Sequence, residues 1–436
     1  MLCYNQLAMK LFGTSGIRRL YNKDLLRLAV NVGLAVGNLY GRVVVGRDTR
    51  TSGEVIKNAL LAGLAAGGAR CYDAGMIPTP TVACCAREFD AGMMITASHN
   101  PPEYNGIKLI KPDGSAFDPA EENRLEQMIE DNSLTSAPWD GLGSIDIYQG
   151  AVERHLQGIL SLLPEKTRIK VVLDCGCAAA SVITPILLER MGCELTFLNC
   201  NPSGFFPHKI EPLGENLRDL IKMTRECGAD IGIAHDGDAD RMMAVDDKGR
   251  FVSGDKLLAI FARSMKSKKV VTTIDASMAI EEMGFEVVRT KVGDPAISVA
   301  LRDGGDIGGE PSGSWIFPAL SLCPDGIFAA AQAVAIASRQ RLSQLVDSIP
   351  SYPILRGNVG SQGVLMSELE QRLMDLKPAA VNNADGIRLE FKDGWLLIRP
   401  SGTEPKIRIT AEARDETRAH QLYDAGINAI IKSART

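Results

Sequence analysis

The sequence predicts an α/β fold, with three similar mixed-sheet α/β domains and a smaller C-terminal α+β domain around a central cleft. Three observations predict it. One order of strands and helices recurs three times, a polar motif follows the last strand of each copy, and the C-terminal stretch has a different pattern. The chain of 436 residues has room for two to four domains, and 45% hydrophobic with 23% charged residues is an ordinary globular composition.

Each copy of the repeat begins with an apolar strand that ends near an aspartate. A helix follows and ends near a glycine (68, 192 or 284), then a second strand, and then a third strand that runs into a polar loop. The first strands are residues 43–45, 171–173 and 270–274, and the third strands are residues 92–95, 230–233 and 306–307. Ligand sites lie at the carboxyl ends of strands in such domains, so the three polar loops should line one cleft.

The C-terminal stretch reads as a helix over 367–376, a hairpin over 387–398 that turns at 392–394, a strand near 407–410 and a final helix. The predicted domains are residues 1–150, 151–250, 251–350 and 351–436. The longest apolar stretch, residues 327–337, is too short to span a bilayer and predicts a core helix instead.

Composition excludes several classes of protein. The net charge of −5, with no block of like charge, argues against a dedicated nucleic-acid binder. No transmembrane segment or signal peptide is expected, so we expect no membrane partner. The ten cysteines include no C-x-x-C pair, which indicates buried thiols in a reducing compartment and predicts a cytoplasmic protein.

Asp236, Asp238 and Asp240 alternate in the loop after the third strand of the second copy. Three carboxylates this close repel one another unless a cation lies between them, and hard cations such as Mg²⁺ prefer oxygen ligands. An EF-hand is excluded because its sixth loop position, which needs glycine, is Arg241. A guanidinium beside a metal site favours an anionic substrate. The remaining alternative is a solvated acidic turn.

Ser98 lies in the corresponding loop of the first copy, Thr96-Ala97-Ser98-His99-Asn100, before two prolines. His99 is not expected to be its base, because adjacent side chains rarely face one another in that way. By itself a loop serine is usually only a turn residue, and the matching position of the carboxylate loop is what favours a function. Lys108, slightly downstream, has the chemistry to transfer a proton or hold a phosphate.

Three further motifs offer polar groups to a ligand. Glu310 and Ser312 lie on a rigid turn suited to sugar hydroxyls, in the third loop of the repeat. Arg399, Ser401, Gly402 and Thr403 combine a guanidinium, two hydroxyls and free backbone amides, which suits a phosphate, although a plain loop between strands is the alternative. Residues 13–18, ending at Arg18, have a similar but weaker composition.

From residue 10 onward the sequence resembles the α-D-phosphohexomutases, the family of phosphoglucosamine mutase, phosphomannomutase and phosphoglucomutase. The resemblance rests on five motifs in family order: residues 13–18, 96–101, 236–241, 309–313 and 399–404. It implies four domains around a cleft, which agrees with the repeat. The domains would in turn supply the phosphoserine loop, the metal loop, the sugar-recognition loop and a phosphate-binding loop.

The resemblance also implies residue roles. Ser98 would carry a phosphate, and Asp236, Asp238 and Asp240 would hold Mg²⁺ together with an oxygen of that phosphate. Arg18, Lys108 and Arg241 would surround the transferring group. Glu310 and Ser312 would bind sugar hydroxyls, and a final set would grip the phosphate that is not transferred: Arg399, Ser401, Gly402 and Thr403.

The implied reaction interconverts hexose 6-phosphate and hexose 1-phosphate through phosphoserine and a bisphosphate, with hexose 1,6-bisphosphate as activator and a homodimer as one possible assembly. Many members have histidine where this chain has Ser314, and some have histidine in the preceding loop, where this chain has Asp294. Asp294 resembles bacterial phosphoglucosamine mutases, and Trp315 after the Glu-Pro-Ser-Gly motif resembles archaeal relatives, so glucosamine phosphate is the favoured substrate.

Three alternatives stay open. One is a phosphomannomutase/phosphoglucomutase of broad specificity. The second is a sugar phosphatase with Asp236 as nucleophile, which would leave the Ser98 loop unexplained. The third is a protein that only binds sugar phosphates, for which neither a metal loop nor Ser98 would be needed.

Overall fold

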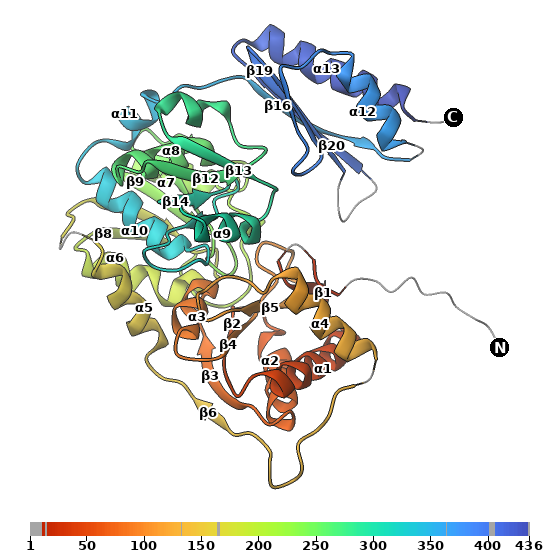
Figure 1. Cartoon of the computed structure of the whole chain (residues 1–436). Helices are drawn as coiled ribbons and strands as arrows, with labels where there is room; N and C mark the ends of the chain where they lie inside the picture. The colour runs from red at the N-terminus through yellow and green to blue at the C-terminus, as the bar shows by residue number, and fades with distance from the viewer. Residues whose placement is uncertain are drawn as a thin grey trace.

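The computed structural model describes residues 11–13, 15–131, 133–163, 166–362, 364–400 and 406–434. Its strands form four sheets, one for each of four successive units along the chain (Figure 1). The predicted fold class is therefore correct, whereas the domain boundaries near residues 150, 250 and 350 stay predictions. Within the described part of the chain, no helix is both long and apolar enough to cross a lipid bilayer.

The first unit has a six-stranded sheet in the order β1-β5-β4-β2-β3-β6. Consecutive residues of β2 point to opposite faces, so Val43 and Val45 join the core under α1, α2 and α4, while Val44 joins the core under α3. The elements are β1 Ile17–Leu20, α1 Lys23–Leu39, β2 Arg42–Arg47, α2 Gly53–Ala66, β3 Arg70–Met76, α3 Thr79–Ala86, β4 Ala91–Ile95, β5 Tyr104–Ile110, α4 Pro119–Glu130 and β6 Ile145–Ile147.

The second unit has a five-stranded sheet in the order β11-β10-β9-β7-β8. Its helix α5 packs towards the first unit, since Ala151 at its start belongs to the core around α3. The elements are α5 Ala151–Leu160, β7 Lys170–Asp174, η1 Ala179–Val182, α6 Thr184–Arg190, β8 Glu194–Leu198, α7 Arg218–Glu226, β9 Ile231–His235, β10 Met242–Asp246 and β11 Phe251–Val252.

The third unit has a four-stranded sheet in the order β13-β12-β14-β15. The predicted core helix over 327–337 is confirmed as α10, which is buried along nearly its whole length. The elements are α8 Gly254–Ser264, β12 Lys269–Thr273, η2 Met278–Met283, β13 Glu286–Thr290, α9 Asp294–Arg302, β14 Ile307–Gly309, β15 Trp315–Ile316, α10 Gly326–Ala337 and α11 Leu342–Asp347.

The threefold repeat is confirmed by strand order. The same sequence of neighbours occurs in each of the three sheets, as β5-β4-β2-β3, β10-β9-β7-β8 and β15-β14-β12-β13. In every copy the fourth strand returns antiparallel after the polar loop. One detail differs from the prediction. The helix expected before Gly284 is the 3₁₀ helix η2, because the segment is only 6 residues long and ends in a left-handed Gly284, and 3₁₀ turns are common in such short segments. Its first amide, that of Met278, donates to Glu412.

The fourth unit is an antiparallel sheet in the order β16-β20-β19-β18-β17, with α12 and α13 on one face. On the other face Trp395 and Leu397 pack against Ile274 of the third unit. The predicted helix, hairpin, strand and final helix are confirmed. The elements are β16 Ile354–Gly360, α12 Met366–Met374, β17 Ala380–Asn382, β18 Ile387–Phe391, β19 Gly394–Pro400, β20 Lys406–Ala413 and α13 Glu416–Lys432.

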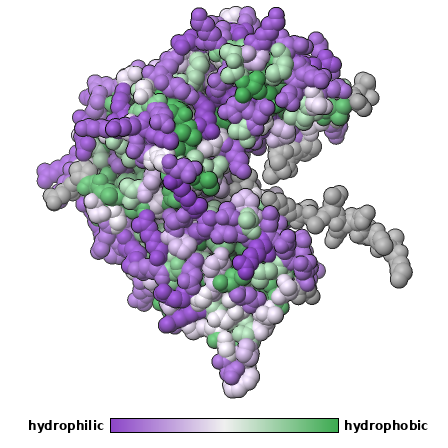
Figure 2. All heavy atoms as spheres, viewed as in Figure 1, coloured by the Kyte–Doolittle hydropathy of each residue, from purple (hydrophilic) through white to green (hydrophobic). Residues whose placement is uncertain are grey.

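Hydrophilic side chains cover most of the face shown in Figure 2, and hydrophobic ones are confined to separate areas. The same view shows that the surface is hollowed between the C-terminal unit and the first unit. A groove beside β19 and β20 is lined by Arg356, Arg399 and Arg408 from the fourth unit and by Asp275 from the third.

Candidate active site

The three polar loops of the repeat each connect a third strand to its antiparallel fourth strand. They lie between β4 and β5, between β9 and β10, and between β14 and β15. The first two loops meet directly, because the Ser98 hydroxyl donates a 2.7 Å hydrogen bond to Asp236 Oδ2. The shared location predicted from the sequence is therefore present for these two loops.

Buried hydrogen bonds hold the Ser98 loop from beneath. Ser98 has a left-handed backbone, with φ of 49°, and is 1% exposed. Its amide donates to Thr96 Oγ1 at 2.8 Å, and the Thr96 hydroxyl donates to Asp48 Oδ2 at 2.7 Å. The Arg50 guanidinium pairs with Asp48 and donates to four loop carbonyls, those of Ser98, Asn100, Pro101 and Tyr104. A charged group with five donors thus fixes the loop.

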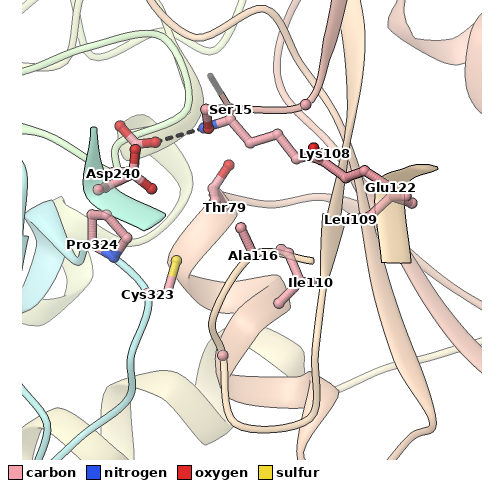
Figure 3. Close-up of a pocket in the computed structure, with 13 residues that line it drawn as sticks. Ser15, Thr79, Lys108, Leu109, Ile110, Ala116, Glu122, Asp240, Cys323 and Pro324 are labelled. Atoms are coloured by element: carbon pink, nitrogen blue, oxygen red, sulfur yellow. Dashed lines mark hydrogen bonds and ion pairs between the residues drawn. The ribbon is translucent and has the colours of Figure 1, made fainter. Parts of the chain in front are cut away.

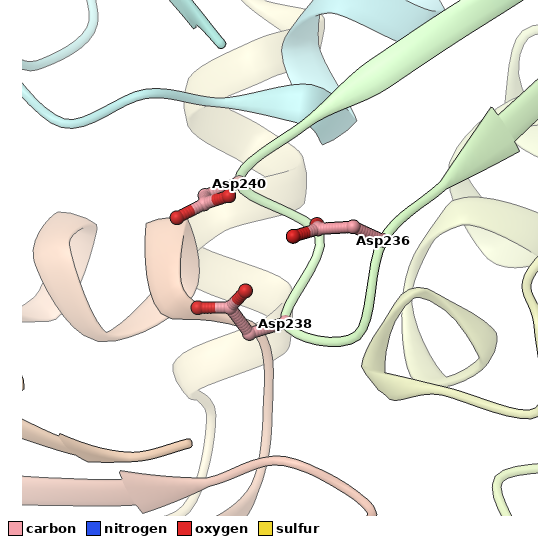
Figure 4. Close-up of side chains that lie close together, drawn as sticks. All are labelled: Asp236, Asp238 and Asp240. Carbon is pink, nitrogen blue, oxygen red and sulfur yellow. The ribbon is translucent and has the colours of Figure 1, made fainter. Parts of the chain in front are cut away.

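The three aspartates form a compact buried cluster. One carboxylate oxygen each of Asp236, Asp238 and Asp240 lies within 4.8 Å of the others, and Figure 4 shows the three side chains turned towards a common space. Gly237 is required between them, since a Cβ there would lie 2.4 Å from the Ser98 carbonyl oxygen. This close approach brings the serine loop and the aspartate loop together.

Charge in the cluster is only partly balanced by protein groups. Lys108 Nζ donates to Asp238 Oδ2 and to Asp240 Oδ2, each at 2.6 Å. Burial alone would raise the pKa of Asp238, but Lys108 holds it below its usual value. Among the described residues no ammonium group donates to Asp236. Burial and the neighbouring carboxylates therefore raise the pKa of Asp236 well above the usual value. Burial would lower the pKa of Lys108, and the two aspartates raise it instead.

The cluster fits a divalent cation. Asp238 Oδ1 and Asp240 Oδ1 are buried and have no hydrogen-bond partner among the described residues. Such anionic oxygens are costly to leave bare, and they are the ligands that Mg²⁺ prefers. A set of three carboxylates able to bind a metal is thus present, as the sequence predicts.

Arg241 and Arg18 lie at the edge of the cluster. The Arg241 amide donates to Asp236 Oδ1 at 3.3 Å, and its guanidinium lies 3.5 Å from Glu211. Arg18, in β1, donates to Asn100 Oδ1 at 3.0 Å and so reaches the serine loop. Both arginines are close enough to lower the pKa of His99, although burial is the larger cause of its fall to about 2.

One geometric expectation was wrong. His99 Nδ1 lies 3.2 Å from the Ser98 hydroxyl, so the adjacent side chains do meet. The left-handed backbone at Ser98 turns its side chain back towards its neighbour, which an extended loop would not do. With a pKa of about 2, however, the His99 imidazole is a weak proton acceptor.

The third loop meets the aspartate loop through the backbone, because the Met242 amide donates to the Gly313 carbonyl oxygen at 3.0 Å and Arg241 pairs with Ser314 in an antiparallel bridge. Glu310 Oε1 accepts from the Gly293 amide at 2.6 Å, and its Oε2 accepts from the Ser312 hydroxyl at 2.9 Å. Burial raises the pKa of Glu310, and Arg241 opposes that rise. Burial also raises the pKa of Asp294 to about 7, aided by Asp240 and Glu310.

A small pocket beside the cluster joins residues from all three copies of the repeat. Figure 3 shows Lys108, Thr79, Asp240, Cys323 and Pro324 around it. The Thr79 hydroxyl donates to Asp238 Oδ2. The fourth unit contributes elsewhere: Arg399 Nη1 pairs with Asp385 at 2.8 Å, in the groove between the third and fourth units. Ser401, Gly402 and Thr403 lie outside the described residues.

Several residues that build this site were given no role from the sequence, namely Asp48, Arg50, Thr79 and Thr96, the last of which was noted only as part of the Ser98 loop. Asp48 stood out only as the end of the first strand of the repeat. The signal that could have found Arg50 is its place two residues after that aspartate, at the strand edge where ligand sites occur.

Family models match all four units. The matches are to phosphoglucomutase/phosphomannomutase α/β/α domain I at residues 9–136, domain II at 153–249, domain III at 253–352 and the C-terminal domain at 364–428. The chain belongs to the phosphoglucomutase/phosphomannomutase family. The resemblance read from the five motifs is therefore confirmed, and the family is one of phosphohexomutases.

Curated members of the family align over almost the whole chain. A probable phosphoglucosamine mutase of Methanocella arvoryzae is 47% identical over 97% of this chain and 98% of its own. The protein of the same name from Methanosarcina barkeri is 48% identical over 95% and 98%. The chain is thus an enzyme of the phosphohexomutase class.

Solved structures of the family have the same fold. A phosphoglucomutase/phosphomannomutase family protein from Burkholderia thailandensis superposes with a TM-score of 0.87 at 28% identity, over 97% of both chains. An N-acetylphosphoglucosamine mutase from Aspergillus fumigatus, solved with GlcNAc-6P and magnesium, superposes with a TM-score of 0.61 at 16% identity, over 98% of this chain and 96% of that one. The second likeness shows the fold alone.

Proposed function

We propose that this phosphohexomutase converts glucosamine 6-phosphate to glucosamine 1-phosphate. The reaction class follows from the family, and the choice of glucosamine is supported by the names of the relatives at 47% and 48% identity. The observation that carries the mechanism is the 2.7 Å contact between the Ser98 hydroxyl and Asp236, within the buried cluster of three aspartates.

Ser98 is the proposed carrier of the phosphoryl group. The bond between Ser98 Oγ and phosphorus breaks as a sugar hydroxyl oxygen bonds to that phosphorus, the proton of that hydroxyl is exchanged for one on Ser98 Oγ, and the product is a hexose bisphosphate. After the sugar reverses its orientation, its other phosphate returns to Ser98 Oγ and the isomeric monophosphate leaves. Added hexose 1,6-bisphosphate would restore phosphoserine, so we propose it as the activator.

The cations around Ser98 would bind the charge that develops on the transferring group. Lys108 is held 2.6 Å from two aspartates, which raise its pKa above the usual value despite its burial. Arg241 and Arg18 approach from the aspartate loop and from Asn100. Phosphoryl transfer is stabilised mainly by such positioned charges.

Mg²⁺ is the proposed metal, held by Asp236, Asp238, Asp240 and an oxygen on Ser98. The two unpaired carboxylate oxygens in the cluster support this assignment. When bound, a divalent cation would withdraw charge from the phosphoryl oxygens. The protein residues orient Ser98, exclude water by burial and supply the surrounding donors.

Substrate recognition is assigned to the third and fourth units. Glu310 and Ser312 form a rigid pair beside Arg241, which suits them to sugar hydroxyls. Arg399 would grip the phosphate that is not transferred, from the groove between the units, together with Ser401, Gly402 and Thr403. A guanidinium matches a phosphate in a bidentate way.

A substrate panel tests the proposed sugar. The purified protein, with Mg²⁺ and a trace of the matching bisphosphate, would be assayed on glucosamine, mannose and glucose 6-phosphates. We expect the highest kcat/KM for glucosamine 6-phosphate. Equal values for all three sugars would overturn the narrow specificity and favour a broad phosphomannomutase/phosphoglucomutase, and release of inorganic phosphate without isomerisation would overturn the mutase proposal.

A further inference from the structure

A buried chain of hydrogen bonds lies behind the aspartate loop and joins three helices. Thr81 of α3, His155 of α5 and Asp325 at the start of α10 are at most 2% exposed. Thr81 Oγ1 lies 2.9 Å from His155 Nδ1, and His155 Nε2 lies 2.8 Å from Asp325 Oδ2. A carboxylate only accepts, so Nε2 carries the hydrogen of this imidazole.

One end of this chain controls α3, which binds the aspartate loop. Thr79, at the start of the helix, donates its amide to the Asp238 carbonyl oxygen at 3.0 Å and its hydroxyl to Asp238 Oδ2. Thr81 lies in the same helical turn. The position of α3 therefore fixes both the backbone and the carboxylate of Asp238.

The other end controls α10. Asp325 is its N-cap, because Oδ1 accepts from the Phe328 amide at 2.8 Å while Oδ2 faces His155. Gly326, the first residue of α10, packs so closely on the loop that a Cβ would lie 2.4 Å from the Arg241 carbonyl oxygen and 2.8 Å from that of Ala239. These carbonyls flank Asp240, so α10 supports the opposite side of the same loop.

We propose that Thr81, His155 and Asp325 form a hydrogen-bonded bridge that sets the spacing between α3 and α10. This spacing in turn positions Asp238 and Asp240 to bind the metal. The proposal rests on the metal site proposed above. His155 is a positioning residue, since it contacts neither Asp238 nor Asp240 and acts only through the two helices. Because α3 and α10 contact the aspartate loop from two sides, the three carboxylates stay close together despite their mutual repulsion when no cation is bound.

Measurement of direct metal binding tests this hydrogen-bonded bridge without relying on turnover. Calorimetric titration with Mn²⁺ would compare the full-length protein with Thr81→Val, His155→Phe, His155→Gln and the double variant Thr81→Val/His155→Phe. We expect His155→Phe and Thr81→Val to weaken Mn²⁺ binding by roughly tenfold, the lower end of the effect of losing an outer-shell partner, because both residues act one contact further from the metal ligands. His155→Gln, which keeps a donor for Asp325, should recover part of the loss.

Two features distinguish this role from general support of the fold. The double variant should bind Mn²⁺ no more than about twofold more weakly than His155→Phe, since both changes break one chain. Thr224→Val is the matched control: Thr224 is buried, but its hydroxyl bonds within its own helix at Leu220, so it should lower stability without changing affinity.

The outcomes are separable. Unchanged Mn²⁺ affinity in folded Thr81→Val and His155→Gln, or an equal loss of Mn²⁺ affinity in Thr224→Val, would overturn the role of the hydrogen-bonded bridge while leaving the metal site intact. Absence of Mn²⁺ binding by the unaltered protein would overturn both proposals. If His155→Phe does not fold, the Thr81→Val and His155→Gln comparison still decides the question.

Discussion

The Ser98 hydroxyl and the Asp236 carboxylate meet in a hydrogen bond of 2.7 Å, although their loops follow strands of different sheets. The two residues are 138 positions apart along the chain. Arg50 holds the serine loop and Gly237 lets the aspartate loop approach it, so the contact depends on the packing of two units.

Lys108 should be essential for turnover. Lys108→Met removes the ammonium that bonds Asp238 and Asp240, and so also a charge facing the transferring group. We expect kcat to fall roughly 100-fold or more, as when one preorganised donor to the developing charge is removed from an active site. Steady-state kinetics would measure it.

Lys57→Met is the control for that change. Lys57 is a second buried lysine of the first unit, paired with Asp73 at 2.6 Å. It should affect stability and leave kcat nearly unchanged. Equal losses of kcat in the two variants would contradict a specific role for Lys108.

Arg50 should stabilise the fold through the serine loop. Its guanidinium and Asp48 are both fully buried, and four carbonyls depend on it. Arg50→Met leaves Asp48 buried without its partner, which costs about 3 to 5 kcal/mol in comparable pairs. Urea unfolding would measure the free energy of unfolding. A change of less than about 1 kcal/mol, as expected for a typical surface substitution, would contradict this account.

His208 should make stability depend on pH. The buried Asp174 carboxylate accepts from His208 and raises its pKa above the ordinary 6.5. A group with a raised folded pKa stabilises the protein fully below its unfolded pKa, and this contribution is lost as pH rises through the folded value. The free energy of unfolding should therefore fall relative to His208→Gln as pH rises above about 6.5.

Chemical unfolding at a series of pH values would check this dependence. His420→Gln, at an exposed position on α13, is the control and should follow the unaltered protein. A constant difference between the unaltered protein and His208→Gln across that range would show that the Asp174 contact does not shift the histidine.

Arg399 should act on substrate binding more than on chemistry. Arg399→Met removes the guanidinium proposed to hold the phosphate that is not transferred, so KM for glucosamine 6-phosphate should rise roughly tenfold or more. Arg414→Met, an exposed arginine of the same unit paired with Glu282, should leave KM unchanged. A fall in kcat with an unaltered KM would contradict the assignment.

Local patterns explain how much of the fold was predictable. Strands of consecutive apolar residues, glycines at helix ends and the hairpin turn at 392–394 are encoded nearby in the sequence, and the structure confirms them. The common strand order of the three copies follows from that local order and the right-handed connection of parallel strands. The contact of the first amide of η2 with Glu412 was not predictable, because Glu412 lies far along the chain.

The residues of the site divide in the same way, into those that a local sequence pattern reveals and those that depend on distant partners. Asp236, Asp238 and Asp240 stood out because closely spaced carboxylates need a cation. Arg50 and His155 did not, because each looks like an ordinary surface residue until its partners are known. The four carbonyls that Arg50 binds lie 48 to 54 residues away, and Asp325 lies 170 residues from His155. Burial of a polar group is decided by packing between units, which a local pattern does not contain.

The central claim is that Ser98 carries the phosphoryl group. Peptide mass spectrometry of the purified protein, before and after incubation with glucose 1,6-bisphosphate, tests it most directly, with Ser98→Ala as the variant and the exposed Ser133→Ala as its control. The account predicts phosphate on Ser98 that increases with the bisphosphate, and loss of both the label and the isomerisation in Ser98→Ala only. Full turnover by Ser98→Ala, or phosphate found solely on an aspartate of the cluster, would contradict it.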